Sequence, residues 1–386
     1  MGTRVFGTVA SGFEPVADAF GASFDGLPDM GAGLSVRVEG ETVVDLWGGV
    51  ADARDGRAWQ ADTPTLVFSC TKGLVAIVAA QLVAEGRLDY DAPVARYWPD
   101  FAANGKAGAT IADALSHRAG LSAPRRDLGL EDVLDWDRMV AVLAEQEPLW
   151  VPGTGHAYHA ITHGWLNGEV IRRVTGKSVG ANLAERIAAP LAVDMTVGRP
   201  EALRVPPAHV VADPALSQFW RDEAAKPEPN WLLRSMTLGH ALPADLVTPD
   251  GGFNDPRLQA AEIPGAGGIA SARALATIWS ATVTETNGVR LLDGQAIRRA
   301  TTAKSFGPQV FPVPEPYCSW GLGLQLDSPA RRYLTARSFG HDGAGGQVQF
   351  ADPEHRIGFG FVTNWMMGPD DTRATRIIDA LRTLVH

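Results

Sequence analysis

A serine and a lysine stand three positions apart where a long apolar run begins, in "VFSCTKGLVAIVAAQ", residues 67–81. The apolar residues recur at helical spacing, so we expect residues 70–86 to form a helix, with Ser69 and Lys72 on one face. A serine hydroxyl needs a neighbouring base before it attacks a carbonyl carbon. A lysine can be that base when burial or nearby cations lower its pKa. The pair indicates a nucleophile at a helix start, where the backbone N–H of Ser69 can face an oxyanion.

Two further segments supply residues for the same chemistry. The segment "WVPGTGHAYHA", residues 150–160, brings Tyr158 from a glycine-rich turn to the start of a predicted helix. A tyrosinate stabilised by a nearby ammonium can act as a general base. The segment "FGHDGAGGQ", residues 339–347, carries His341 where a glycine-rich stretch opens a strand. Glycines there let the backbone approach a ligand and offer N–H groups.

A second serine motif has a structural interpretation. The segment "GKSVG", residues 176–180, fits the Gly-x-Ser-x-Gly pattern of a nucleophile elbow, which requires a strand before the serine. A helix is predicted there instead. We therefore expect Gly176 to end that helix and Ser178 to cap the next one.

Three histidines around Tyr158 are spaced like metal ligands. His156, His159 and His163 are three and four residues apart, but only the last two share a helical face, and no His-Glu-x-x-His pattern is present. We therefore expect pocket lining or structural hydrogen bonds, with no metal and no cofactor. His117, in "LSHRAGL", is expected to hold a turn beneath the site.

Tryptophans and cysteines complete the set of candidates. Tryptophan is usually a core residue, so we expect only about two of the candidates to line an acyl pocket, and Trp231 and Trp365 are favoured. Cys70 points away from Ser69 around the helix, which favours a buried thiol. Two cysteines are too few for a disulfide framework, so free thiols and a reducing compartment are predicted. The candidate pocket tryptophans are Trp150, Trp220, Trp231, Trp320 and Trp365.

The composition is that of a soluble globular protein. The chain has 386 residues, is 45% hydrophobic and carries a net charge of −10, which argues against nucleic-acid or anionic-membrane partners. No apolar run reaches the roughly 18 residues that span a membrane, and the first residues lack the apolar region of a signal peptide. We expect a cytoplasmic protein whose partner is a small-molecule substrate. These features do not determine the oligomeric state.

Strand patterns cluster at the two ends of the chain, and helical patterns fill its middle. The simplest arrangement is a sheet assembled from both ends, with a helical insertion against it. Residues 1–80 and 261–386 would form an α/β domain, and residues 81–260 a mainly helical domain. Residues 200–262 look irregular but hold tryptophans, which favours an ordered lid. Helices are predicted at residues 10–25, 70–86, 109–116, 131–146, 162–175, 179–189 and 370–385, and strands at 33–50, 320–327, 346–351 and 356–364.

Taken in order, these motifs give the chain a family resemblance. It resembles the superfamily of class C β-lactamases and penicillin-binding proteins, and more narrowly the family VIII carboxylesterases, from about residue 10 to residue 385. The resemblance implies an α+β fold, an α/β sandwich with an antiparallel sheet flanked by helices. The motifs that carry it are "SCTK" (69–72), "LSHRAGL" (115–121), "PGTGHAYHA" (152–160), "TGKSVG" (175–180), "PGAGGIASARALA" (264–276) and "GHDGAGG" (340–346).

The resemblance also implies a role for individual residues. Ser69 would be the acylated nucleophile, Lys72 would take its proton or tune its partner, and Tyr158 would be the general base and then the acid. The oxyanion hole would consist of the backbone N–H groups of Ser69 and Ala344. His341, with Asp342 and Gly343, stands where relatives carry Lys-Thr-Gly. The implied substrate-binding residues are His341, Gly343, His159, Trp231 and Trp365.

Two departures from the family pattern decide between activities. Tyr158-His159-Ala160 replaces Tyr-x-Asn, which removes an amide that would bind a β-lactam side chain. His341 replaces a lysine that would meet the antibiotic's carboxylate, and histidine is largely neutral at pH 7. We therefore predict a serine carboxylesterase acting on small to medium esters, with short acyl chains favoured. The alternatives are a β-lactamase, D-alanyl peptidase, amidase or acyl-transfer enzyme, and a non-catalytic binding protein on the same scaffold.

Overall fold

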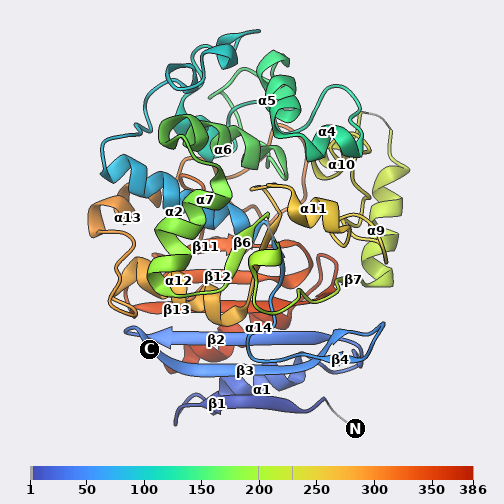
Figure 1. Cartoon of the computed structure of the whole chain (residues 1–386), viewed down its shortest axis with the longest axis vertical. Helices are drawn as coiled ribbons and strands as arrows, with labels where there is room; N and C mark the ends of the chain where they lie inside the picture. The colour runs from blue at the N-terminus through green and yellow to red at the C-terminus, as the bar shows by residue number, and fades with distance from the viewer. Residues whose placement is uncertain (1–2, 199, 228, 386) are drawn as a thin grey trace.

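The computed structural model, which describes residues 3–198, 200–227 and 229–385, is organised around one antiparallel sheet (Figure 1). The strand order is β1-β3-β2-β13-β12-β11-β10-β9, and β4 pairs with β3. At its centre, β2 from the start of the chain pairs with β13 from its end, as the sequence predicts. The strands are β1 (Val5–Val9), β2 (Gly31–Val38), β3 (Glu41–Asp52), β4 (Arg57–Ala58), β9 (Ser319–Trp320), β10 (Gln325–Leu326), β11 (Phe339–Asp342), β12 (Val348–Asp352) and β13 (Ile357–Thr363).

Each face of this sheet has its own hydrophobic core. Helices α1 (Glu14–Ala22) and α14 (Arg373–Leu384) cover one face, and α12 (Ala272–Val283) covers the other. Glycines in β13 let α12 pack directly on the strand, because a Cβ at Gly358 would lie 2.3 Å from the backbone nitrogen of Ser280. The core under α1 and α14 includes Val16, Phe20, Ile377, Ile378 and Leu381, packed with Leu34, Val36, Phe350, Phe359 and Phe361.

The helical part of the chain lies beyond the β9–β11 side of the sheet (Figure 1). A small sheet, β5-β8-β6, joins the two parts, and β7 (Val211–Ala212) pairs with β14 (Trp365–Met366). The elements are β5 (Thr65–Phe68), β6 (Met195–Val197), β8 (Gly268–Ala270), α2 (Cys70–Ala84), α3 (Ile111–Leu115), α4 (Leu130–Leu134), α5 (Trp136–Glu145), α6 (Thr162–Thr175), α7 (Val179–Leu183), α8 (Ala189–Leu191), α9 (Pro214–Ala224), α10 (Trp231–Thr237), α11 (Pro256–Ala260) and α13 (Gly294–Ala300). Single 3-10 or π turns are η1 (Val94–Arg96), η2 (Pro99–Ala102), η3 (Ala184–Ala188), η4 (Pro200–Ala202) and η5 (Ala344–Gly346).

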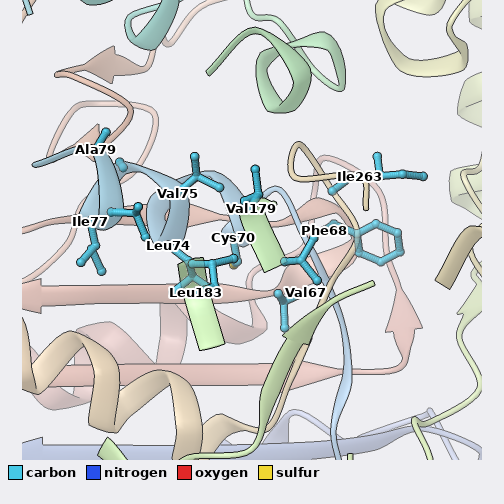
Figure 2. Packing of buried hydrophobic residues seen from close by; sticks show 14 of the residues in the cluster. Val67, Phe68, Cys70, Leu74, Val75, Ile77, Ala79, Val179, Leu183 and Ile263 are labelled. Carbon is cyan, nitrogen blue, oxygen red and sulfur yellow. The ribbon is translucent and has the colours of Figure 1, made fainter. Parts of the chain in front are cut away.

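Helix α2 runs through the middle of the molecule and is buried on nearly every side. Figure 2 shows Leu74, Val75 and Ile77 of this helix near Val179 and Leu183 of α7. The sequence predicts one apolar face, but a helix that is apolar all round is a core helix. The polar groups at its start, Ser69 and Lys72, are therefore set against a hydrophobic interior.

Several sequence-based boundaries need correction. The helix predicted at 131–146 is two helices, α4 and α5, because Asp135 leaves the helical conformation and its side chain caps Arg138. The segment 200–262 contains helices α9, α10 and α11, which the irregular pattern did not reveal, and its movement as a lid remains a prediction. Helices α12 and α13 were not predicted. No helix in the described part of the chain has the length and hydropathy needed to cross a bilayer.

Candidate active site

The turn between β5 and α2 presents Ser69 at the start of the helix. Phe68, the last residue of β5, has a left-handed backbone with φ of 45°, which is uncommon for a residue with a large side chain. Its buried ring packs edge-on against Phe253, with ring centroids 5.7 Å apart. Thr71 Oγ1 donates to the Phe68 carbonyl at 2.6 Å and accepts from the Gly268 N–H at 2.9 Å. Tertiary packing therefore holds a strained turn that the local sequence would not adopt alone.

Lys72 is fully buried directly behind Ser69. Its Nζ lies 2.9 Å from Ser69 Oγ and donates to the carbonyls of Ala160 and Gly265, each at 2.6 Å. Burial holds the pKa of Lys72 well below its usual value. A neutral amine has two N–H donors and one lone pair. In the neutral form of Lys72, with both donors on these carbonyls, the lone pair would face the serine hydroxyl, which is the geometry of a general base.

Tyr158 lines the same cavity as Ser69. The ring centroid is 5.0 Å from Lys72 Nζ, and the ring stacks on Trp320 at 5.2 Å. The backbone on each side is fixed, because the Tyr158 N–H donates to Gln309 and its carbonyl accepts from Ser235. Burial raises the pKa of Tyr158, so its phenol is protonated at rest. This favours Tyr158 as an acid and proton relay over the predicted tyrosinate base.

His341 occupies the end of β11 and faces the same space. The glycine-rich residues that follow it form the turn into β12, so the histidine ends a strand where the sequence predicts a strand opening. Its Nδ1 lies 2.6 Å from the Asp342 carbonyl, which places the proton on that nitrogen. Nε2 is buried and has no partner among the described residues. Burial lowers the pKa of His341 to about 3, so the ring presents a neutral acceptor.

Three other histidines, His117, His159 and His163, are buried near Tyr158. His117 Nδ1 accepts from the His159 N–H at 3.1 Å, and His159 Nε2 accepts from the Leu121 N–H at 3.1 Å. His163 Nε2 lies 3.1 Å from the Leu115 carbonyl. These contacts match the predicted structural role of His117. Within the residues that the structure describes, no group of three His, Cys, Asp or Glu side chains is arranged to hold a metal ion.

A cavity of about 390 Å³ opens in front of Ser69. Of the residues predicted from the sequence, Ser69, Tyr158, Trp231, His341, Gly343 and Ala344 line it, and Lys72 lies behind Ser69. Aromatic and aliphatic side chains form most of the remaining wall, including Leu232, Met236, Phe311, Val313 and Trp320.

Two predicted substrate-binding residues lie outside this cavity. His159 is fully buried behind Tyr158, where its ring serves backbone groups. Trp365 belongs to β14, and its indole N–H donates to Asp213 at 3.1 Å. Trp320 takes the place expected for Trp365, because β9 pairs with β10 and brings the indole against Tyr158. The sequence marks Trp320 only as one of several tryptophans, since nothing local reveals which strand borders Tyr158.

The secondary candidates behave as predicted. Ser178 caps α7, where its Oγ accepts from the Ala181 N–H and donates to Glu262, and Gly176 ends α6 in the left-handed conformation. Cys70 is a buried free thiol that donates to the His341 carbonyl at 3.1 Å. Cys318 is also free. Ser178 therefore serves as a helix cap, and Cys70 does not line the cavity, so neither residue competes with Ser69 for the role of nucleophile.

Comparisons with known proteins identify the family to which this fold belongs. A family model described as Beta-lactamase matches residues 22–382. The chain is 36% identical over 383 residues to the esterase/beta-lactamase LipL of Mycobacterium tuberculosis, which covers 95% of this chain and 85% of that protein. It is similar to the crystal structure of a family VIII carboxylesterase, with 36% identity, a TM-score of 0.87, and coverage of 99% and 100% of the two chains. EstA from Arthrobacter nitroguajacolicus Rue61a gives 32% identity, a TM-score of 0.84, and coverage of 100% and 99%.

Proposed function

This chain belongs to the beta-lactamase family, and we propose that it is a serine carboxylesterase that hydrolyses small to medium esters through an acyl-enzyme on Ser69. The match confirms the family and the fold that the sequence motifs imply. Similarity to a family VIII carboxylesterase and to proteins named as esterases supports ester hydrolysis. The single observation that carries the mechanism is the buried Lys72 amine, 2.9 Å from Ser69 Oγ.

Acylation begins when Ser69 Oγ attacks the ester carbonyl carbon and Lys72 takes the hydroxyl proton. The negative charge that develops on the carbonyl oxygen is stabilised by the N–H groups of Ser69 and Ala344, which both border the cavity. Collapse of the tetrahedral intermediate breaks the bond to the alcohol oxygen. Tyr158 donates the proton that this oxygen needs, and is reprotonated from Lys72 through the Ser69–Lys72–Tyr158 contacts.

Deacylation repeats these steps with water as the nucleophile. The same basic groups accept a proton from water, which attacks the acyl carbonyl, and Ser69 leaves as the hydroxyl. Each step uses only side chains and backbone groups of this chain. We keep a cytoplasmic location as a prediction, supported by the two free thiols.

β-Lactam hydrolysis is the second candidate, because LipL carries both activities in its name. The neutral His341 ring offers no positive charge to a β-lactam carboxylate, which makes this the weaker activity. Amide hydrolysis and acyl transfer would use the same acyl-enzyme. A protein that only binds its ligand would not need the Lys72 amine to face a serine hydroxyl.

Hydrolysis of p-nitrophenyl butyrate by the wild type and by Ser69→Ala tests the proposal. We expect the variant to lose roughly a thousandfold or more in kcat, as is typical when a covalent nucleophile is removed. Ser178→Ala is the matched control, because that serine is a helix cap and should leave turnover unchanged. A serine-directed phosphonate should label Ser69. An inert wild type, or equal activity in wild type and Ser69→Ala, would remove the proposal.

A further inference from the structure

A second cavity adjoins the one in front of Ser69. Its volume is about 260 Å³. The two cavities share four bordering residues, which form the boundary between them: Met236 of α10, and Asp342, Gly343 and Ala344 at the end of β11. Ala344 carries the N–H group assigned above to the oxyanion. The second cavity therefore begins where the substrate carbonyl would end.

The walls of the second cavity are suited to hydrocarbon. Its charged groups are occupied by partners within the protein. Arg331 pairs with Asp342 at 2.5 Å, Asp371 pairs with Arg373 at 2.7 Å, and Asp245 accepts from the Ser217 hydroxyl. The apolar lining consists of Leu216, Phe219, Trp220, Met236, Leu246, Met366, Met367, Pro369 and Ala374. Arg331, the cationic side chain of the lining, is already ion-paired, so an anionic ligand would find no unpaired cation among these residues.

The floor of the second cavity is rigid. Gly345 has φ of 80°, and a Cβ there would lie 2.5 Å from Met366 Cγ, so only glycine fits. Arg373, which is buried, donates to the carbonyls of Gly345 at 3.0 Å and Trp365 at 2.8 Å. The segment that separates the two cavities is therefore tied to helix α14. The fixed part of the boundary past Ala344 is built into the fold, and its variable part is the flexible side chain of Met236.

The chemistry decides which part of an ester points each way. The leaving alcohol must lie near Tyr158 to receive its proton, and Tyr158 is on the Trp320 side of the first cavity. The carbonyl oxygen lies between the N–H groups of Ser69 and Ala344. An acyl chain that leaves the carbonyl carbon along Gly343 and Ala344 would reach residues that border both cavities.

We propose that the acyl chain of the substrate passes Ala344 and Met236 into the second cavity, so that the enzyme prefers esters of unbranched, medium-length fatty acids. This inference rests on the proposed function. In this arrangement, Leu216 and Met236 determine the selectivity for the acyl chain, and the first cavity binds the alcohol part of the ester. The sequence predicts that short acyl chains are favoured. The second cavity instead predicts that the preferred acyl chain is long enough to reach its far end.

The test is a chain-length series of p-nitrophenyl esters, from acetate through butyrate and hexanoate to octanoate. Leu216→Trp fills the second cavity, and we expect it to lower the hexanoate-to-acetate ratio of kcat/KM by about tenfold, because displacing roughly two terminal methylenes loses ~4-fold for each. Met236→Phe narrows the opening and should act in the same direction. Met236→Ala widens it and should raise the octanoate-to-hexanoate ratio, which keeps the test valid if Leu216→Trp does not fold.

Two controls separate this inference from the proposed function. Phe6→Trp introduces the same side chain on exposed β1, and its chain-length ratios should equal those of the wild type. Acetate esters of ethanol, butanol and hexanol should give the same ratios in the wild type and Leu216→Trp. If Ser69-dependent acetate hydrolysis is present and all acyl ratios stay unchanged, or the alcohol ratios move instead, the inference is overturned while the esterase stands. If no hydrolysis depends on Ser69, the proposed function falls first.

Discussion

Two lysines in the described part of the chain are completely buried, and only one of them contacts a residue that borders the cavity in front of Ser69. Lys72 and Lys106 have the same exposed fraction, 0%. Lys106 Nζ donates to the carbonyls of Ala103 at 2.8 Å and Gln146 at 2.5 Å, and lies 5.6 Å from the Phe101 ring centroid. Burial lowers the pKa of both lysines. Burial and carbonyl partners are therefore not enough to make a catalytic base.

The difference lies in the third partner and in access to substrate. Lys72 has a serine hydroxyl at 2.9 Å and a tyrosine ring beside it, and that serine borders a cavity. Lys106 has a phenylalanine ring in the equivalent place and ties residues 103 and 146 together. Burial lowers the pKa of both lysine side chains, so a lowered pKa does not identify a general base. The neighbouring groups distinguish a lysine that can act as a base from one that is structural. Substitutions that remove one lysine, or that give Lys72 the kind of neighbour that Lys106 has, test which difference matters.

The largest effect is expected from exchanging each lysine for methionine, which preserves most of the side-chain volume. Lys72→Met should lower kcat for a p-nitrophenyl ester by ~10²–10⁴, the usual contribution of a general base. Lys106→Met should leave kcat/KM within about twofold, since Lys106 borders no part of the site cavity. Thermal unfolding of both variants checks that the folded state is retained. Equal losses of activity would mean that Lys72 acts only by holding the fold together.

A smaller effect is expected from Tyr158→Phe, which gives Lys72 the kind of aromatic neighbour that Lys106 has. We expect a loss of about a hundredfold on alkyl esters, because their alkoxide leaving groups need a proton donor. The loss on p-nitrophenyl esters should be smaller, because p-nitrophenolate leaves without protonation. Steady-state rates on the two ester types, with the same acyl group, give the comparison. A uniform loss would assign Tyr158 to the proton transfer from Ser69 instead.

The smallest effect concerns stability in acid. Burial, aided by the positive charge that Lys72 carries when it is protonated in acid, lowers the pKa of His117, His159, His163 and His341, to about 4 for His159 and about 3 for His341. Between those values and 6.5 the unfolded chain binds more protons than the folded one, so the free energy of unfolding falls as the pH falls. One such histidine contributes up to about 1.4 kcal/mol per pH unit.

Urea unfolding at pH 7 and at pH 4.5 measures this acid destabilisation. Lys72→Met removes the positive charge that the protonated lysine would place beside these histidines in acid, so its loss of stability between the two pH values should be smaller than that of the wild type. Lys106→Met should behave like the wild type, because none of these pKa shifts has Lys106 among its causes. Identical pH dependence in all three proteins would show that Lys72 and the histidines titrate independently.

The proposed catalytic pair could be placed together from the sequence because the relation between its two residues is local. Ser69 and Lys72 are three residues apart, and helical spacing alone puts them on one face. The cap roles of Gly176 and Ser178 depend on a few neighbouring residues in the same way. The assembly of the sheet from both ends followed from where the alternating segments lie. Tyr158 was recognisable through its motif, although its protonation state was not.

Tertiary structure alone decided the walls of the site. Trp320 stacks on Tyr158, and Trp365 does not, because strand pairing places one indole at the cavity and turns the other toward Asp213. Helices α9 and α10 were hidden in a segment that looked irregular; α10 borders both cavities, and α9 borders the second. The pKa of Lys72 also depends on burial by distant parts of the chain. Local spacing fixes neighbours along one helix, whereas a cavity and its dielectric are set by side chains that meet only after folding.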